Sequence, residues 1–274
     1  MSDSLEIVIV LYECLLEESI SFTSLQRQLK DIKVDYELVI FNNDENRVIE
    51  SDRFLVENST ENLKISGAYN FALERAVKTS KNWLLLLDQD TEVPENYFVV
   101  VQKFLEGGYS PDLAAVVPVL KSGEIILSPK AVSPFLRLES DINHKGYNKW
   151  ITAINSMSLM NVDFLQSIGG FSNKYQLDML DRWSYTQIMK HNKQVYVLDL
   201  CSNHNLSFLN LEENITPARY SDYMKVESIF VADEMNHFYR VFHKIKLFVR
   251  SLRQLVKYKN KTFSKITFSY IFKK

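Results

Sequence analysis

Asp88 and Asp90, separated by one residue, are the side chains of this 274-residue chain whose type and spacing best suit chemistry. They directly follow four leucines at residues 84–87, a run too short for an isolated helix and typical of a strand buried on both faces. Open α/β sheets bind ligands at the carboxyl ends of their strands. Because Mg²⁺ and Mn²⁺ prefer oxygen ligands and keep coordination positions for phosphates, this pattern favours a metal–diphosphate site. An acidic turn after a strand is the structural alternative.

The segments around this pair alternate between strand-like and helix-like hydrophobic patterns. Apolar residues at helical spacing from Ala68 to Val77 predict a helix just before the leucine run. Residues 121–150 are irregular and polar, which is typical of a loop or an insertion. The alternation predicts an α/β fold with a mostly parallel mixed sheet flanked by helices. We expect strands at residues 5–11, 36–41, 84–87, 113–119, 151–160 and 195–200, and a helix at residues 177–191.

Composition places the chain among ordinary globular proteins, with 46% hydrophobic and 24% charged residues. Its two cysteines, Cys14 and Cys201, do not form a CxxC pair, so neither a disulfide framework nor a zinc site is indicated. The N-terminus lacks the basic and apolar regions of a signal peptide, and no apolar run approaches the roughly 18 residues that span a bilayer. We therefore expect a cytoplasmic protein, soluble or peripheral to a membrane.

Charge is distributed unevenly along the chain. Residues 235–274 contain eleven Lys and Arg and no Asp or Glu, so residues 1–234 carry a net charge of −13 in a chain whose total is −2. From Pro217 onward the pattern is helical, and apolar residues from Phe238 to Val256 share one face with Lys and Arg on the other. This pattern favours docking on an anionic membrane surface. Packing on the rest of the chain, or on a second subunit in a homodimer, is the alternative. Nucleic acid is a poorer partner because the remaining body is acidic.

Several of these segments together resemble the family 2 glycosyltransferases of the GT-A fold, and most closely their bacterial rhamnosyltransferases. The similarity runs from Leu5 to about Tyr223, and the order and spacing of its motifs carry more weight than any single motif. The motifs are LLLLDQDT at residues 84–91, NLKISGAYNFALERA at 62–76, IGGF at 168–171 followed by Asp181, then His204, and PARY at 217–220.

The resemblance implies an inverting transferase that moves a sugar from a nucleotide diphosphate to an acceptor hydroxyl. Asp88 and Asp90 would hold Mg²⁺ or Mn²⁺ against the departing diphosphate, with His204 near the metal. Asp181 matches the family's base, which takes the proton from the attacking hydroxyl. The structural alternatives are a carboxylate stabilised by a helix dipole for Asp181 and a hydrogen-bonded surface histidine for His204.

The resemblance also implies which residues lie beside the nucleotide. Asn42 occupies the position that contacts the base or ribose, Asn62 and Asn70 match nucleotide-side asparagines, and Asp88 would also face the donor. The implied donor is a dTDP- or UDP-sugar, with rhamnose from a dTDP-sugar expected. The implied acceptor is a glycan or lipid-linked hydroxyl in bacterial surface-polysaccharide synthesis, at the inner face of the cell membrane. Asparagine also favours turns and helix caps, an alternative strongest for Asn62.

The sequence departs from the family pattern at positions that concern specificity. Phe41 replaces an aspartate that holds the nucleotide base, and Trp183 replaces an acidic residue two positions after the catalytic base Asp181. Lys64, Met157 and Ser207 replace glycines. The metal pair and the base are retained, so the resemblance implies the chemistry more strongly than the choice of nucleotide or acceptor.

The implied organisation is a catalytic domain at residues 1–216, followed by a basic helical extension at residues 217–274. Within the domain, residues 1–120 would form the nucleotide-sugar half and 121–216 the acceptor half. Two other functions compete with this interpretation. One is a non-catalytic partner or regulatory subunit that keeps the fold. The other is a haloacid-dehalogenase-type phosphatase, whose motif requires Thr or Val where this chain has Glu92.

Overall fold

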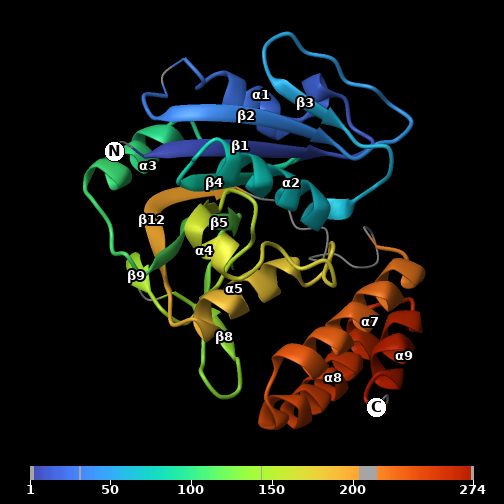
Figure 1. Ribbon diagram of the computed structural model, residues 1–274. Helices are drawn as coiled ribbons and strands as arrows, with labels where there is room; N and C mark the ends of the chain where they lie inside the picture. The colour runs from blue at the N-terminus through green and yellow to red at the C-terminus, as the bar shows by residue number, and fades with distance from the viewer. Residues whose placement is uncertain (1–2, 31, 143, 204–214, 273–274) are drawn as a thin grey trace. The chain divides into compact units, whose positions relative to one another are not determined.

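The computed structural model describes residues 3–30, 32–142, 144–203 and 215–272. The described chain divides into two compact units. The sheet unit comprises the described residues of Met1–Ala131 and Ser140–His204, and the helical unit those of Val132–Glu139 and Asn205–Lys274. Figure 1 shows the helices and strands of each unit.

A nine-stranded mixed sheet forms the centre of the sheet unit, in the order β3-β2-β1-β4-β11-β5-β12-β9, with β6 paired to β5. Strands β3, β2, β1 and β4 are parallel to one another, whereas β11 runs antiparallel to both β4 and β5. The principal strands are β1 (Ser4–Leu11), β2 (Asp35–Asn42), β3 (Leu55–Asn58), β4 (Trp83–Asp88), β5 (Leu113–Ser122), β11 (Leu159–Asn161) and β12 (Gln194–Asn203). The expected mostly parallel sheet is therefore confirmed.

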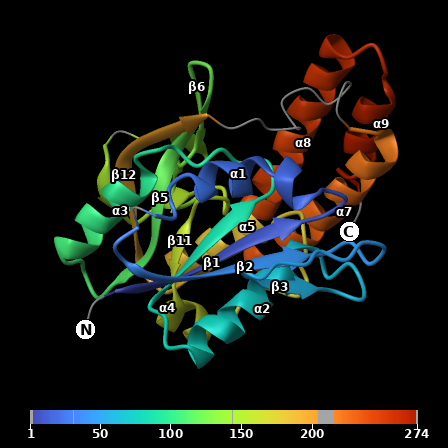
Figure 2. The same cartoon turned by 90° about the horizontal axis from the view of Figure 1, so that it is seen from above.

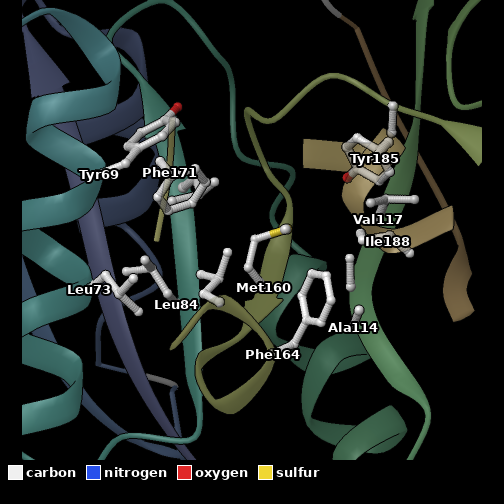
Figure 3. Packing of buried hydrophobic residues seen from close by; sticks show 14 of the residues in the cluster. Tyr69, Leu73, Leu84, Ala114, Val117, Met160, Phe164, Phe171, Tyr185 and Ile188 are labelled. Atoms are coloured by element: carbon white, nitrogen blue, oxygen red, sulfur yellow. The ribbon is translucent and has the colours of Figure 1, made fainter. Parts of the chain in front are cut away.

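Helices cover both faces of this sheet, which explains the continuous apolar run in β4 (Figures 1 and 2). Leu84 and Leu86 pack in the core beneath α2, α4 and α5, whereas Leu85 and Leu87 pack in the core beneath α1 and α3. Figure 3 shows part of the first core, where Leu84 lies near Leu73 of α2. The helices of this unit are η1 (Leu16–Glu18), α1 (Ile20–Gln26), α2 (Lys64–Lys78), α3 (Tyr97–Glu106), α4 (Val162–Ser167) and α5 (Leu180–Lys190).

The middle of the chain contains more regular structure than the sequence predicts. Residues 121–150 include four short strands, and a second sheet has the order β10-β7-β8. The strand expected over residues 151–160 is wrong, because it is broken into β10 and β11 by a turn in which Ser158 N–H donates to the Asn155 carbonyl and Met157 has φ +64°. The short strands are β6 (Ile125–Ser128), β7 (Lys130–Val132), β8 (Glu139–Asp141), β9 (Gly146–Asn148) and β10 (Ile151–Thr152).

Three helices, α7 (Pro217–Glu234), α8 (His237–Lys257) and α9 (Thr262–Ser269), form most of the helical unit. They pack around an aromatic core that includes Tyr220, Tyr258 and Phe263. Buried hydrogen bonds join these helices, since Gln254 of α8 donates to the Tyr220 hydroxyl at 2.8 Å and accepts from Thr267 of α9 at 2.7 Å. The expected helical extension is confirmed. None of the described helices combines the length and apolar content needed to cross a lipid bilayer.

Candidate active site

The candidate site forms at the carboxyl edge of the parallel strands. In the sheet register, Val10 of β1 pairs with Asp88 of β4, and Leu11 of β1 pairs with Asn42 of β2. The polar residues that end β2 and β4 therefore lie at the same edge, on either side of β1. This is the edge at which open α/β sheets bind ligands.

The turn that carries the two aspartates is held by hydroxyl groups from distant segments. The Ser21 hydroxyl of α1 donates to the Asp88 carbonyl and, at 2.7 Å, to the Thr91 carbonyl. On the opposite side, the Ser156 hydroxyl accepts from the Asp88 N–H at 3.0 Å and shares a 2.7 Å hydrogen bond with Thr91. These contacts fix the turn before any ligand arrives.

Asp88 is a half-buried carboxylate at the end of β4, and Asp90 two residues later is exposed. The Tyr69 hydroxyl donates to Asp88 Oδ1 at 2.9 Å, and Tyr69 itself is completely buried in α2. Burial, together with the negative charge of Asp90, raises the pKa of Asp88 to about 6. A cation placed between these carboxylates would relieve that repulsion.

Asp181 lies in the first turn of α5 and is also half-buried. Burial raises its pKa to about 7, the negative charge of Asp88 adds to the rise, and a hydrogen bond from the Asn155 backbone lowers it. The charge of Asp88 therefore acts on Asp181. A carboxyl with a pKa near neutrality is suited to act as a general base.

The segment between β10 and β11 therefore contacts both acidic positions, through Asn155 at Asp181 and Ser156 at Asp88. Asn155 is 2% exposed, and both polar atoms of its side-chain amide lack a hydrogen-bond partner among the described residues. Buried amides without partners are uncommon in folded proteins, and a bound polar group can satisfy them. The sequence predicts an uninterrupted strand here and therefore does not identify this part of the site.

Asp88 and Asp90 suit a divalent cation that is also bound by substrate phosphates. Within the described part of the chain, no cluster of three or more His, Cys, Asp and Glu side chains is arranged to hold a metal ion alone. Mg²⁺ is commonly bound through one or two carboxylates, with substrate phosphates and water completing its shell. Asp88 and Asp90, with their mutual repulsion, match that donor set.

Asn70 joins two distant segments of the sheet unit. Its amide nitrogen donates to the Phe171 carbonyl at 2.9 Å, and its amide oxygen accepts from the Phe171 N–H at 2.7 Å. The turn comes so close that a Cβ at Gly170, where φ is +83°, would lie 2.6 Å from that oxygen. These contacts of Asn70 with the IGGF motif tie α2 to the segment leading to Asp181, and we call the two hydrogen bonds the lock between them. Contact of Asn70 with a nucleotide stays a prediction.

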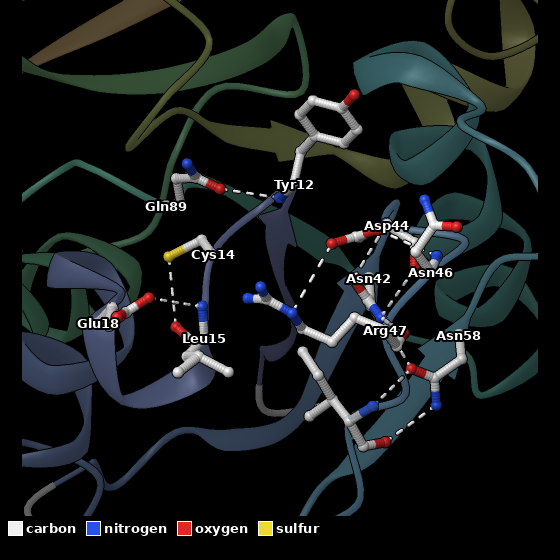
Figure 4. A network of polar contacts seen from close by, with 11 residues as sticks. Tyr12, Cys14, Leu15, Glu18, Asn42, Asp44, Asn46, Arg47, Asn58 and Gln89 are labelled. Carbon is white, nitrogen blue, oxygen red and sulfur yellow. Dashed lines mark hydrogen bonds and ion pairs between the residues drawn. The ribbon is translucent and has the colours of Figure 1, made fainter.

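Asn42 is completely buried and shapes the loop after β2 (Figure 4). Its amide nitrogen donates to the Arg47 carbonyl at 2.6 Å and to Asn58 Oδ1 at 2.9 Å, and its oxygen accepts from the Asp44 N–H. Asn62 lies just before α2 and accepts from the Lys64 N–H at 2.9 Å, in an Asx-type turn. Both side chains hold local backbone at the sheet edge, and their contact with a nucleotide stays a prediction.

His204 and Ser207 lie outside the described residues. The other departures from the family pattern have local explanations. Lys64 and Met157, which replace glycines, have φ values of +59° and +64°, a region that glycine enters without strain. Phe41 is buried in the sheet core, and Trp183 packs against that core from α5. Asp88, Asp90 and Asp181 are all present in the chain despite these changes.

Tyr69 and Asn155 were not predicted from the sequence, and neither were the Ser21 and Ser156 hydroxyls that hold the Asp88 turn. Tyr69 could have been identified, because it lies one residue after Ala68 in the predicted helix and reaches the strand ending in Asp88. Burial and the charges of Asp88, Asp181 and Asp90 raise its pKa well above the usual value, so all three carboxylates lie within electrostatic range of one hydroxyl. Nothing in the sequence identifies Asn155, because its role depends on the turn that interrupts the predicted strand.

Comparison with solved structures reveals similar folds at low sequence identity. The S. aureus TarS fragment 1–349 has a TM-score of 0.52 at 12% identity, over 95% of this chain and 74% of that one. The same fragment in complex with UDP-GlcNAc gives 0.52 at 13%, over 94% and 73%. The mannosyltransferase PcManGT from Pyrobaculum calidifontis, in complex with GDP-Man and Mn²⁺, gives 0.51 at 12%, over 99% and 70%.

No protein-family model matches the sequence, and no curated protein matches it significantly. The structural similarities show the fold: the chain has the mixed α/β architecture of GT-A-type glycosyltransferases, as the sequence predicts.

Proposed function

We propose that this protein is an inverting, metal-dependent glycosyltransferase that moves a sugar from a nucleotide diphosphate to an acceptor hydroxyl. The observation that carries the proposal is the placement of Asp88 and Asp90 at the carboxyl edge of a GT-A-type sheet, with the adjacent residues Asn155 and Ser156 bonded to Asp181 and Asp88 respectively. Two carboxylates that share a cation and a third that accepts a proton are the groups this reaction requires.

Asp88 and Asp90 would hold Mg²⁺ or Mn²⁺, which stabilises the negative charge that develops on the departing nucleoside diphosphate. Tyr69 donates to the Asp88 carboxylate and Ser156 accepts from its backbone N–H, which would orient this carboxylate before the donor binds. His204 is proposed as a further metal ligand on the resemblance alone.

Asp181 would take the proton from the acceptor hydroxyl as that oxygen attacks the anomeric carbon from the side opposite the diphosphate. The new C–O bond forms, the bond from that carbon to the diphosphate oxygen breaks, and the electron pair leaves with the nucleotide. The Asn155 N–H stabilises the ionised form of Asp181. Its unpartnered side-chain amide is suited to a substrate hydroxyl.

The donor proposed is a dTDP- or UDP-sugar, with rhamnose from a dTDP-sugar as the specific candidate. Asn42, Asn62 and Asn70 lie on segments that border the sheet edge and would shape the nucleotide pocket. Complexes of the similar proteins with GDP-Man and Mn²⁺ and with UDP-GlcNAc support a nucleotide-sugar donor. We assign residues 1–216 to the catalytic domain, with its donor half at 1–120 and its acceptor half at 121–216.

The acceptor proposed is a hydroxyl of a glycan or lipid-linked glycan in bacterial surface-polysaccharide synthesis. The extension at residues 217–274 would bring the protein to an anionic membrane, on its cytoplasmic face. The exposed apolar side chains of α8 support this placement. A homodimer through the same helix is the competing arrangement.

The decisive experiment measures donor binding and transfer separately, with a panel of nucleotide sugars and Mn²⁺ or Mg²⁺. Asp88→Asn and Asp90→Asn should each weaken metal-dependent donor binding by about tenfold or more. Asp181→Asn should keep that binding yet reduce transfer by about 10³-fold, because only the base is lost. Asp163→Asn is the matched control, an exposed carboxylate in the first turn of α4 with no proposed role in proton transfer.

The outcomes separate the competing functions. Specific donor binding without transfer to any acceptor would favour a non-catalytic partner. If no nucleotide sugar binds with either metal, the glycosyltransferase proposal fails. Unchanged transfer in Asp181→Asn would move the base to another residue.

A further inference from the structure

Asp88 and Asp181 lie on different elements, and the turn at residues 155–158 contacts both of them. The Ser156 hydroxyl accepts from the Asp88 N–H at 3.0 Å. The neighbouring Asn155 backbone N–H forms a hydrogen bond with Asp181. A shift of the 155–158 turn would therefore change how the two carboxylates are held, so the contacts that fix this turn matter to the site.

The 155–158 turn has an unusual backbone. Met157 has a φ of +64°, a conformation that residues other than glycine rarely adopt, and its side chain is completely buried. Such a conformation persists only where surrounding contacts hold it. Two hydrogen bonds to β4 supply part of that restraint. The Met157 N–H donates to the Leu86 carbonyl at 2.7 Å, and the Leu86 N–H donates to the Ser158 carbonyl at 3.1 Å.

Two buried tyrosine hydroxyls hold the 155–158 turn from opposite faces of the sheet. Tyr97 of α3 donates to the Met157 carbonyl at 3.2 Å. Tyr185 of α5 shares a 2.7 Å hydrogen bond with the Ser158 hydroxyl. Tyr97 is 1% exposed and Tyr185 is 0% exposed, and they belong to the separate cores on the two faces. The turn is therefore tied to a helix on each side of the sheet.

The direction of the Tyr185 hydrogen bond follows from the other contact of Ser158. The Ser158 hydroxyl donates its one proton to the Ile154 carbonyl at 2.8 Å, so it accepts from Tyr185. Tyr185 is itself packed in the same core as Val117 and Ile188 (Figure 3). Because the bond is buried, loss of either partner leaves the other without water to replace it, so the contact is costly to break.

Tyr185 also lies on the same face of α5 as Asp181. The two residues are four apart, which is about one turn of the helix. Burial raises the pKa of the Tyr185 hydroxyl, and the charge of Asp181 adds to the rise, so the two groups lie within electrostatic range. Tyr185 thus connects the helix that carries Asp181 to the turn whose Asn155 N–H bonds to that carboxylate.

We propose that Tyr185 is a positioning residue for Asp181. Through Ser158 it holds the 155–158 turn against α5, and so keeps the Asn155 N–H directed at the carboxylate. Because Tyr185 is completely buried, it acts through these contacts and not by touching a substrate. The inference rests on the proposed transferase function for the role of Asp181 as base, whereas the contacts can be tested in the free protein.

An NMR titration of the full-length protein tests these contacts without substrate or metal. The amide proton of Asn155 should show a titration step near pH 7, because it is hydrogen-bonded to Asp181, and Asp181→Asn should remove this step. In Tyr185→Phe the midpoint should rise by at least about 0.5 pH unit, since the hydrogen bond that favours the ionised carboxylate is weakened. A step that persists in Asp181→Asn would overturn the assumed contact.

Tyr109→Phe is the matched control for this titration. It removes a hydrogen-bonded tyrosine hydroxyl beside Trp83, at the other end of β4 from Asp88, and should leave the Asn155 midpoint unchanged. An equal rise in Tyr109→Phe would show that any loss of a buried hydroxyl has this effect. The other charges that act on the carboxylate are the same in both tyrosine variants: Asp88, Asp178 and Arg182.

A second variant tests the other partner of the hydrogen bond. Ser158→Ala should also raise the Asn155 midpoint, because it removes the group that accepts from Tyr185. Since the two hydroxyls form one contact, the double variant should show no larger rise than Ser158→Ala alone. Additive rises would mean that the two residues act separately and would overturn the proposal. So would an unchanged midpoint in both single variants.

Transfer kinetics test the consequence for the reaction. Tyr185→Phe should lower kcat by about tenfold and keep the KM for the nucleotide sugar within about twofold, because donor binding does not use Asp181. Tyr109→Phe should change neither constant. A raised KM with unchanged kcat would overturn the positioning role. A shifted Asn155 midpoint in a protein without transfer activity would support the contact and count against the transferase function alone.

Discussion

At the scale of single residues, the site combines carboxylates that resist ionisation with contacts that hold them in place. Desolvation is the largest cause of the raised pKa of both Asp88 and Asp181, and each is also near another acid. The pKa of Asp181 is raised to about 7, so proton transfer to its ionised carboxylate would require a pH near or above neutrality. A divalent cation at Asp88 would offset part of the repulsion and extend activity to lower pH.

These electrostatic features were only partly predictable. The sequence predicts Asp88 and Asp90 because a buried strand must deliver them to the sheet edge. It identifies Asp181 through resemblance, since nothing local distinguishes this carboxylate from any other in the first turn of a helix. The roles of Tyr69 and Asn155 depend on contacts between segments more than 15 residues apart in the chain, which hydrophobic periodicity does not describe.

Asn70 provides a residue-scale test of the lock between α2 and the turn before α5. Asn70→Ala removes the paired hydrogen bonds to the Phe171 backbone and should lower the free energy of unfolding by about 1–3 kcal/mol. Urea denaturation at constant pH measures this change. Asn173→Ala is the control, because exposed Asn173 shares only a 3.4 Å contact with Asn70.

Loss of this lock should also affect the site. Because the turn leads into α5, Asn70→Ala should reduce transfer more than donor binding if the lock acts mainly by positioning Asp181. A loss of donor binding alone, with stability unchanged, would instead support the predicted contact of Asn70 with the nucleotide.

At the scale of elements, prediction succeeded where burial is uniform and failed where a strand is interrupted. Strand β4 was identified because both of its faces are covered, so every residue from Trp83 to Leu87 is apolar. The segment from Ile151 to Met160 mixes six apolar residues with four polar ones. Its turn at residues 155–158 is fixed by hydrogen bonds to β4, including Met157 N–H to the Leu86 carbonyl at 2.7 Å. Tertiary contacts of that kind override local pattern.

Glu6 of β1 is a buried carboxylate, and its ionisation is open to test. It is completely buried, Arg75 of α2 donates to its Oε1 at 3.2 Å, and its Oε2 has no partner among the described residues. Burial raises the pKa of Glu6 from 4.5 to about 7, although the hydrogen bond from Arg75 opposes the rise. The folded protein therefore keeps a proton on Glu6 at pH values where the unfolded chain has lost it.

Between about pH 4.5 and about 7, Glu6 binds more proton in the folded state, so its contribution to the free energy of unfolding falls as pH rises. Glu6→Gln should remove this contribution and be more stable than the wild type at pH 8, by up to about 3 kcal/mol. Denaturant unfolding at pH 5 and pH 8 measures the difference. Glu37→Gln, which alters the other carboxylate bound by Arg75 at 2.7 Å, should retain the pH-dependent fall. A Glu6→Gln variant with the wild-type pH dependence would contradict this account.

At the scale of the whole molecule, charge and composition indicated two parts with different surroundings. The structure has two compact units, and the positive charge of residues 235–274 belongs to the helical one. The short segment Val132–Glu139 also belongs to the helical unit, a grouping that no local sequence feature signals. Chain segments distant in sequence can join one unit only through tertiary contacts, which explains why composition alone did not reveal it.

The exposed apolar face of α8 leads to a whole-molecule prediction about membrane docking. Phe248 and Leu252 are 47% and 48% exposed on this face, with Lys and Arg on either side of it along the helix. Phe248→Glu/Leu252→Glu should reduce co-sedimentation with vesicles containing phosphatidylglycerol by about tenfold or more, because it adds negative charge and removes apolar area at the contact. Binding of the unchanged protein should fall as salt rises, since head-group attraction is screened.

Val99→Glu is the control for this prediction, because Val99 is 66% exposed on α3 of the sheet unit and has no proposed lipid contact. The control should bind vesicles as the wild type does. If the α8 variant keeps its vesicle binding but changes from dimer to monomer in sedimentation equilibrium, the exposed face is a subunit contact and not a membrane contact. If neither vesicle binding nor oligomeric state changes, this face serves neither role. Only loss of vesicle binding with an unchanged oligomeric state fits a helix that rests on anionic lipid, because only there do its exposed apolar area and its flanking positive charge both find partners.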